Sequence, residues 1–275
     1  MSRLMQHPWR SAVVTGASSG IGEAFARSLA DAGVPQRLIA RSVNRLPQLP
    51  GADSAETTYG DQKRALAALA GIDTLFMVSA AESADRLDQH RTFIDAAAEA
   101  GVRHIVYTSF LGAAPDATFT LARDHWVTEE HIRASGLAFT FLRDSFYLDF
   151  LPALAGEDGV IRGPAGDGLV GAVARSDIAA VAVSVLQDLD SHVGQTYNLT
   201  GREALTLSEA ASIITEVTGA RVSIASTATT AGSSLSSASY EILIGARAEQ
   251  AHGPVGVSAP YEQGFRVIVG SRSAA

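Results

Sequence analysis

Apolar and β-branched runs alternate with alanine-rich segments of helical period along the first 150 residues. The run at 11–16 predicts a buried strand, and the segment 22–33 predicts a helix that ends at Gly33. The same alternation predicts further strands over 37–41, 55–61, 73–80, 103–110 and 137–143, and helices over 63–71, 85–100 and 121–135. Strands that alternate with helices indicate a parallel sheet covered on both faces. The predicted fold is therefore α/β, a Rossmann-type doubly wound parallel sheet over residues 10–150.

The periodic pattern is looser after Leu151, and residues 151–225 predict a small C-terminal substrate lobe. Its expected elements are a loop over 163–168, a strand over 170–175, a helix over 176–189 with Ser176 as its N-cap, a strand over 195–201 and a helix over 205–219. Residues 226–275 have no sustained apolar period, and we expect an irregular or atypical tail there.

The stretch TGASSGIG at 15–22 joins the first predicted strand to the first predicted helix. That context is the one a dinucleotide-binding glycine loop requires, because glycines allow a tight turn and a close approach of the backbone to a diphosphate. An ordinary strand–helix turn is the alternative. The residues expected to contact the cofactor here are Gly16, Ser18, Ser19, Gly20, Ile21 and Gly22.

The residue after the second predicted strand indicates which cofactor is preferred. Arg41 stands there, and no carboxylate follows before Asp53. Arginine suits the 2′-phosphate of NADP, whereas NAD sites place an acidic residue for the ribose, so NADPH is the predicted cofactor. Asp61 is expected either to accept a hydrogen bond from adenine or to cap the helix after it, and the two roles are compatible.

Short-chain reductases deliver a proton through a Tyr-x-x-x-Lys pair on one helix face. The sequence matches this pattern only at Tyr59 and Lys63, which we expect on a strand and across a turn from it. The helix over 120–136 has neither tyrosine nor lysine, and His125 is its candidate proton source, with a packing role as the alternative. Without the pair, an electrophilic acceptor such as a quinone is favoured over a simple ketone.

Several longer stretches resemble the NmrA-like atypical short-chain dehydrogenases, and more narrowly their bacterial quinone and triphenylmethane-dye reductases. The resemblance rests on YGD (59–61), AAAEAGVRHIVYTSF (96–110), FTFLRDSFYLDF (139–150), GPAGDG (163–168), AVARSDIAAVAVSVL (172–186) and QTYNLTG (195–201). The glycine loop departs from it, because the family usually has TGATGxxG.

The resemblance implies an NADPH-dependent oxidoreductase that transfers hydride to a quinone or a similar conjugated acceptor. It implies that nicotinamide lies near Ser79, Thr108 and Ser109, and that Arg143, Asp144 and Tyr147 line the substrate cleft. Ser79 and Ala80 end the fourth predicted strand, where small residues allow the cofactor to pass close by. Tyr147 is also a candidate catalytic residue, with a core aromatic role as its alternative. The competing functions are a non-catalytic NAD(P)-sensing regulator and a carbonyl or isoflavone-type reductase.

Composition narrows the class of partner. The net charge of −8 argues against nucleic acid, and the absence of cysteine excludes disulfides and thiolate metal sites. No metal site is predicted from the histidine spacing either. No apolar run approaches the ~20 residues of a membrane span, and the stretch MSRLMQHPWR lacks the apolar core expected of a secretory signal peptide. We therefore expect a cytoplasmic monomer or homodimer that acts on a small-molecule electron acceptor.

Overall fold

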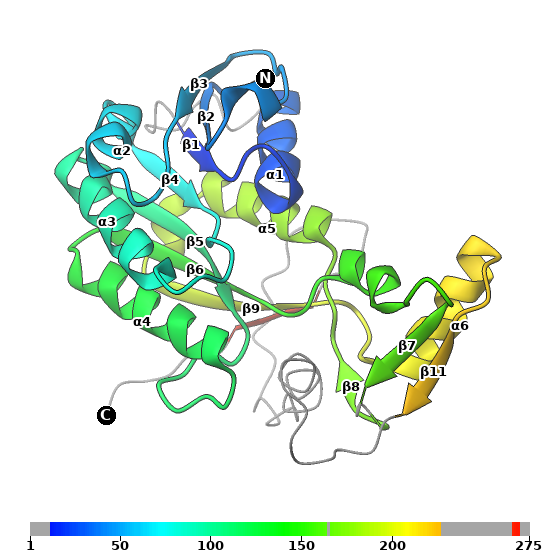
Figure 1. Ribbon diagram of the computed structural model, residues 1–275. Coiled ribbons are helices and arrows are strands. Elements are labelled where there is room, and N and C mark those ends of the chain that lie inside the picture. The colour runs from blue at the N-terminus through cyan, green and yellow to red at the C-terminus, as the bar shows by residue number, and fades with distance from the viewer. Residues whose placement is uncertain (1–11, 164–165, 227–265, 270–275) are drawn as a thin grey trace. The chain divides into compact units, whose positions relative to one another are not determined.

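Figure 1 shows the computed structural model, which describes residues 12–163, 166–226 and 266–269. Two units can be separated by their internal contacts. The first comprises the chain up to Arg143 together with Arg175–Tyr197, and the second comprises Asp144–Ala174 and the chain from Asn198 onward. Of the predicted C-terminal tail, only the short strand β12 (Arg266–Val269), next to β9 in the sheet, lies beyond Ser226 among the described residues.

The first unit is built on a parallel sheet, as the alternation of strands and helices predicted. Its strands are β1 (Ala12–Thr15), β2 (Gln36–Ala40), β3 (Ala52–Glu56), β4 (Thr74–Met77), β5 (His104–Phe110), β6 (Ala138–Asp144) and the start of β9 (Gln195–Thr200). They follow the order β9-β6-β5-β4-β1-β2-β3, and β1 pairs in parallel with both β2 and β4. The strand order therefore reverses between β1 and β4, where doubly wound sheets bind ligands.

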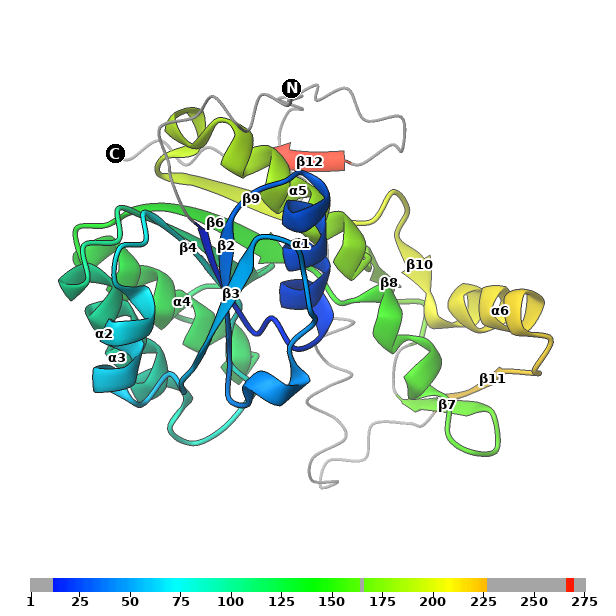
Figure 2. The ribbon, with the colours of Figure 1, turned by 90° about the horizontal axis from the view of Figure 1, so that it is seen from above.

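Helices cover both faces of this sheet (Figures 1 and 2). On one face lie α2 (Gln62–Leu69), α3 (Arg86–Glu99) and α4 (Thr120–Ala134), and on the other lie α1 (Gly20–Asp31) and α5 (Arg175–Gln187). Phe93 of α3 and Phe141 of β6 are fully buried in the first of these layers. In the second, Phe25 of α1 packs on Phe76 of β4 with ring centroids 4.1 Å apart.

Three boundaries differ from the sequence prediction for physical reasons. β3 covers Ala52–Glu56 instead of 55–61, because its neighbour β2 ends at Ala40, the partner of Glu56. The strand expected over 170–175 is reduced to β8 (Leu169–Val170). The helix expected from Ser176 begins at Arg175, so the Ser176 hydroxyl lies inside the first turn and donates to the Asp177 carboxylate at 3.4 Å instead of capping the helix.

The second unit has two small sheets and one long helix. β7 (Val160–Gly163) pairs in parallel with β11 (Ser223–Ser226), and β8 pairs antiparallel with β10 (Leu205–Thr206). The helix α6 (Leu207–Thr218) starts with a capping box between Thr206 and Glu209 and ends at Gly219, whose φ is 71°. Its apolar face closes a separate core formed by Leu151, Ile161, Val170, Ala172, Leu207, Ala210 and Ala211.

Candidate active site at the carboxyl ends of the strands

The glycine loop has the backbone that its sequence predicted. Gly16 and Gly20 have φ values of 63° and 61°, a region that favours glycine. A Cβ on Gly22 would lie 2.5 Å from the carbonyl oxygen of Gly16, so only glycine allows α1 to approach β1 this closely. Ser19 stands at the N-cap of α1 without forming a side-chain cap hydrogen bond. The first N–H groups of α1 therefore remain available to an anion.

Arg41 lies directly after β2 and is exposed. The nearest downstream carboxylate, Asp53, is engaged elsewhere, because the Arg37 guanidinium donates to both of its oxygens at 3.0 to 3.2 Å. Asp53 is therefore not available to bind a ribose at this strand end. The exposed arginine suits a phosphate group.

Asp61 acts as the N-cap of α2, which is one of the two roles predicted for it. Its carboxylate accepts a hydrogen bond from the backbone N–H of Arg64 at 3.0 Å. The contact with adenine remains a prediction.

The Tyr59–Lys63 match is not a proton-donating pair, although Tyr59 lies in a turn after β3 and not on a strand. Its hydroxyl donates to the carbonyl of Val78 and also contacts the hydroxyl of Thr15. Burial raises the pKa of Tyr59, whereas a catalytic pair needs that pKa lowered. Lys63 is exposed on α2.

The predicted cofactor residues of β4 and β5 meet at one edge of the sheet. The N–H of Ser79 donates to the hydroxyl oxygen of Thr108 at 2.9 Å. Ser79 and Ala80 are half-buried, whereas Thr108 and Ser109 are buried. The ends of β4 and β5 are therefore connected, and Ser79 and Ala80 after β4 are more open than Thr108 and Ser109.

Ser109 and Arg143 share a partner that the sequence prediction missed. The carboxylate of Glu129 on α4 is fully buried, and it accepts hydrogen bonds from the Ser109 hydroxyl at 2.6 Å and from Arg143 at 2.8 and 2.6 Å. Arg133 is also within 3.3 Å of it. The i, i+4 spacing of Glu129 and Arg133 was visible in the sequence, but their contact with β6 was not.

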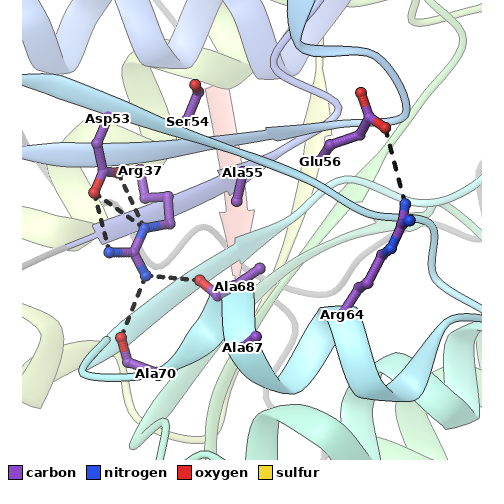
Figure 3. Close-up of a pocket in the computed structure, with 9 residues that line it drawn as sticks. All are labelled: Arg37, Asp53, Ser54, Ala55, Glu56, Arg64, Ala67, Ala68 and Ala70. Carbon is purple, nitrogen blue, oxygen red and sulfur yellow. Dashed lines mark hydrogen bonds and ion pairs between the residues drawn. The ribbon is translucent and has the colours of Figure 1, made fainter.

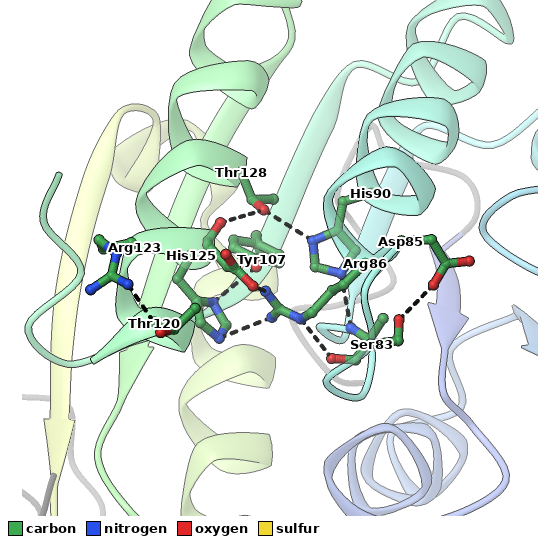
Figure 4. Close-up of polar contacts among 11 residues, drawn as sticks. Ser83, Asp85, Arg86, His90, Tyr107, Thr120, Arg123, His125 and Thr128 are labelled. Atoms are coloured by element: carbon green, nitrogen blue, oxygen red, sulfur yellow. Dashed lines mark hydrogen bonds and ion pairs between the residues drawn. The ribbon is translucent and has the colours of Figure 1, made fainter. Parts of the chain in front are cut away.

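His125 is enclosed in the first unit, and both of its ring nitrogens are engaged (Figure 4). Nε2 lies 3.1 Å from the guanidinium of Arg86, and Nδ1 lies 2.9 Å from the hydroxyl of Tyr107. Burial, followed by the charge of Arg86, lowers the pKa of His125 well below its ordinary value. This geometry favours the packing alternative over proton donation. Arg86 was missed because nothing in its local sequence distinguishes it from a surface arginine.

Asp144 and Tyr147 lie close together in the second unit. The Tyr147 hydroxyl donates to Oδ2 of Asp144 at 3.5 Å, and Oδ1 of the same carboxyl is buried without a hydrogen bond in the described structure. Burial raises the pKa of Asp144 well above its usual range. Tyr147 is half-buried and packs beside Phe150, which is 50% exposed, so it is not enclosed in an aromatic core.

Away from these residues, a shallow hollow lies on the outer edge of the sheet between β3 and α2 (Figure 3). Alanine side chains line it, and the guanidinium groups of Arg37 and Arg64 beside it are paired with Asp53 and Glu56.

The described part of the chain has no cluster of side chains suited to a metal ion. None of its helices is long and apolar enough to span a bilayer.

Comparison with known proteins agrees with this geometry. A family model described as NAD(P)H-binding matches residues 16–189. Quinone oxidoreductase 2 of Escherichia coli (strain K12) is 34% identical over 76% of this chain and 75% of its own length. NAD(P)H azoreductase of Xenophilus azovorans is 33% identical over 75% of this chain and 73% of its own. The structure of Citrobacter sp. triphenylmethane reductase complexed with NADP(H) has a TM-score of 0.71 and 31% identity, covering 79% of each chain.

Proposed function

The chain belongs to the NAD(P)H-binding, NmrA-like family of oxidoreductases, and we propose that it transfers hydride from NADPH to a quinone or a similar conjugated acceptor. The proposal is carried by the glycine loop, in which Gly22 has no room for a side chain and α1 starts without a side-chain cap. It is supported by the sequence identity of 34% to a quinone oxidoreductase and of 33% to an azoreductase. Quinones and azo compounds are both conjugated acceptors.

The residues present fit a dinucleotide. Gly16, Gly20 and Gly22 allow a diphosphate to approach the backbone, and the N–H groups at the start of α1 stabilise its charge. We propose that Arg41, which is exposed after β2, pairs with the 2′-phosphate and that Ser79 and Thr108, joined by a hydrogen bond, border the nicotinamide. When bound, NADPH supplies a hydride to the acceptor.

Neither His125 nor Glu129, both on the fully described helix α4, is available to donate a proton to the acceptor. His125 is held neutral in the interior, and Glu129 is occupied by Ser109 and Arg143. A ketone would need a positioned acid worth ~10²–10⁴-fold in rate. A quinone that accepts a hydride becomes a stabilised phenolate, which water can protonate afterwards. The arrangement therefore suits a quinone better than a ketone.

On the substrate side we propose that Tyr147 contacts the acceptor and that Asp144, whose pKa is raised by burial, orients its hydroxyl. We propose that Arg143 contributes by holding Glu129, because its hydrogen bonds at 2.8 and 2.6 Å both go to that carboxylate. We also propose a cytoplasmic location, no nucleic-acid partner in view of the net charge of −8, and a monomer or homodimer as the working form.

The test mixes the full chain with NADPH and a panel of small quinones and follows the loss of nicotinamide absorbance. Turnover supports the proposal, and ketones under the same conditions should react far more slowly. Binding of NADP⁺ without turnover of any acceptor would contradict it and favour a sensor. Preferential reduction of ketones would favour the carbonyl reductase instead.

A further inference from the structure

The chain leaves the sheet at Met77, and the three residues that follow are held by side chains instead of a strand partner. The Val78 N–H donates to the hydroxyl of Thr15 at 2.9 Å, and its carbonyl accepts from Tyr59. The Ser79 N–H donates to Thr108, as described above. Backbone groups that leave a ladder need such partners when water is excluded.

The backbone of Ala80 is held on both sides by two side chains of α3, those of Arg86 and His90. Figure 4 shows these two side chains. Its N–H donates to Nε2 of His90 at 2.9 Å, and its carbonyl accepts from Nε of Arg86 at 3.0 Å. The two side chains are 0% and 1% exposed, whereas Ala80 itself is half-buried. Two fully buried polar groups thus converge on one partly open backbone segment.

The hydrogen bonds determine which ring nitrogen of His90 and of His125 carries the proton. A backbone N–H can only donate, so Nε2 of His90 accepts, and its Nδ1–H donates to Thr128, 3.0 Å away. The Thr128 hydroxyl in turn donates a hydrogen bond to the carbonyl of Asp124 at 2.9 Å. Arg86 also only donates, so His125 accepts at Nε2 and is likewise an Nδ1–H tautomer. The segment at Ala80 is therefore tied through α3 to α4.

Burying a guanidinium is unfavourable unless its charge and donors are matched. Nη1 of Arg86 has no hydrogen bond in the described residues and lies 3.6 Å from the carboxylate of Asp124, which is 20% exposed. An apolar residue could fill this interior at a lower free-energy cost of desolvation. What Arg86 and His90 have in common is a hydrogen bond to the backbone of Ala80.

We propose that Arg86 and His90 are positioning residues that fix the Ala80 peptide at the edge of the site where the nicotinamide is bound. They act through the backbone and do not touch the cofactor themselves. This inference rests on the proposed function, in which the ends of β4 and β5 border the nicotinamide. Loss of either bond lets the peptide shift, so hydride transfer slows while the diphosphate contacts in the glycine loop are kept.

Two substitutions at one position separate positioning from packing. His90→Gln can place an acceptor where Nε2 stands, whereas His90→Asn places its amide near Nδ1 and leaves the Ala80 N–H without a partner. We expect His90→Asn to lower kcat/KM for NADPH and a quinone by about 10–100-fold, because an error of ~1 Å can reduce the rate ~10²-fold. We expect His90→Gln to stay within about 3-fold of wild type, and the Kd for NADPH to change little in either. His131→Asn, a change of a partly exposed histidine on α4, is the matched control.

Equal kcat/KM values in the two folded His90 variants would overturn the inference. If neither variant folds by circular dichroism, Thr128→Val decides, since it keeps the shape but removes the acceptor that fixes the His90 tautomer. A fall in kcat/KM with an unchanged Kd supports positioning, and an unchanged kcat/KM overturns it. A wild-type chain that does not oxidise NADPH with any quinone contradicts the proposed function instead, so the two failures are distinguishable.

Discussion

The guanidinium of Arg143 on β6 forms two hydrogen bonds, at 2.8 and 2.6 Å, with the carboxylate of Glu129 on α4. The carboxylate is fully buried and the arginine is 18% exposed, so the pair joins a helix to the sheet away from bulk water. The resemblance implied that Arg143 lines a substrate cleft, which stays a prediction, and the pairing with Glu129 is a contact that the sequence prediction missed. The residue holds a strand end in place, and Ser109 is anchored through the same carboxylate.

Glu129→Ala should therefore destabilise the protein strongly. Removing one partner leaves the other charge buried and unpaired, which typically reduces the free energy of unfolding by about 3–5 kcal/mol. Urea unfolding followed by circular dichroism measures the change. Glu130→Ala is the matched control, because Glu130 is 52% exposed and pairs with Arg133 at the surface, where such pairs contribute about 0–1 kcal/mol. Similar losses in both variants would show that the buried pair has no special role.

Gly22→Ala should disrupt the close packing of α1 on β1 and weaken the binding of NADPH. The added Cβ would meet backbone atoms of Gly16 and Thr15 at 2.5 to 2.6 Å, so α1 must move away from β1. We expect the KM for NADPH to rise by about 10-fold or more, since the diphosphate loses aligned N–H donors worth about 1.5–3 kcal/mol each. Gly60→Ala is the control, because its Cβ would meet only a side-chain carbon of Gln89 at 3.6 Å. Unchanged NADPH kinetics in Gly22→Ala would argue against this loop as the diphosphate site.

Arg41→Ala should discriminate between the two nicotinamide cofactors. Loss of a charge-assisted bond to the 2′-phosphate is expected to raise the KM for NADPH about 10–100-fold and to leave the KM for NADH nearly unchanged. Steady-state kinetics with both cofactors measure the ratio. Arg27→Ala, which removes a surface arginine of α1 that pairs with Glu23, should change neither value. An equal rise for NADPH and NADH would remove Arg41 from the phosphate site.

Asp61→Ser should separate capping from adenine binding. Serine is a good N-cap, so α2 keeps its first turn and the free energy of unfolding changes by less than about 1 kcal/mol. Its shorter side chain cannot extend as far toward a ligand, so a role at adenine predicts a weaker NADPH complex, measured by fluorescence titration. Asp61→Ala removes the cap as well and serves as the comparison. Identical NADPH affinity in wild type and Asp61→Ser would leave Asp61 with the capping role alone.

Acidification should destabilise the fold through its buried histidines. Burial lowers the pKa of His90 to about 3 and that of His104 to about 4, against 6.5 for an ordinary histidine. Between pH 4 and 6.5 these histidines are protonated in the unfolded chain but remain neutral in the folded protein. Each neutral histidine therefore contributes its full stability above pH 6.5. Below pH 6.5 this contribution to the free energy of unfolding falls by up to about 1.4 kcal/mol per pH unit.

Comparison of wild type with His104→Gln isolates this effect. Urea unfolding at pH 6.5, 5.5 and 4.5 should give a smaller slope of stability against pH in the variant, because one titrating group is gone. Asp144, whose pKa is raised, titrates in the opposite sense, and its contribution cancels in the comparison. Equal slopes in the two proteins would mean that His104 is not held neutral in the folded state.

Local sequence determined the class of fold and the backbone of the glycine loop, where we propose that the diphosphate binds. The alternation of strand and helix periods has one stable outcome, a covered parallel sheet, and the TGASSGIG stretch requires glycine for steric reasons that operate within a few residues of Gly22. Arg41 and the capping role of Asp61 follow from the same kind of local information, since both lie directly at the end of one element.

Only the tertiary structure decided which buried polar groups meet. Arg86 and His90 lie one turn apart on α3 and have no distinctive local pattern, and their contacts with Ala80, and that of Arg86 with His125 of α4, depend on how the two helices pack on the sheet. The same packing turned Arg143 toward Glu129 and enclosed His125, because a buried charge or donor must find a partner wherever the fold provides one. Periodicity specifies which face of an element is buried, and the partner across that face is set by the packed structure alone.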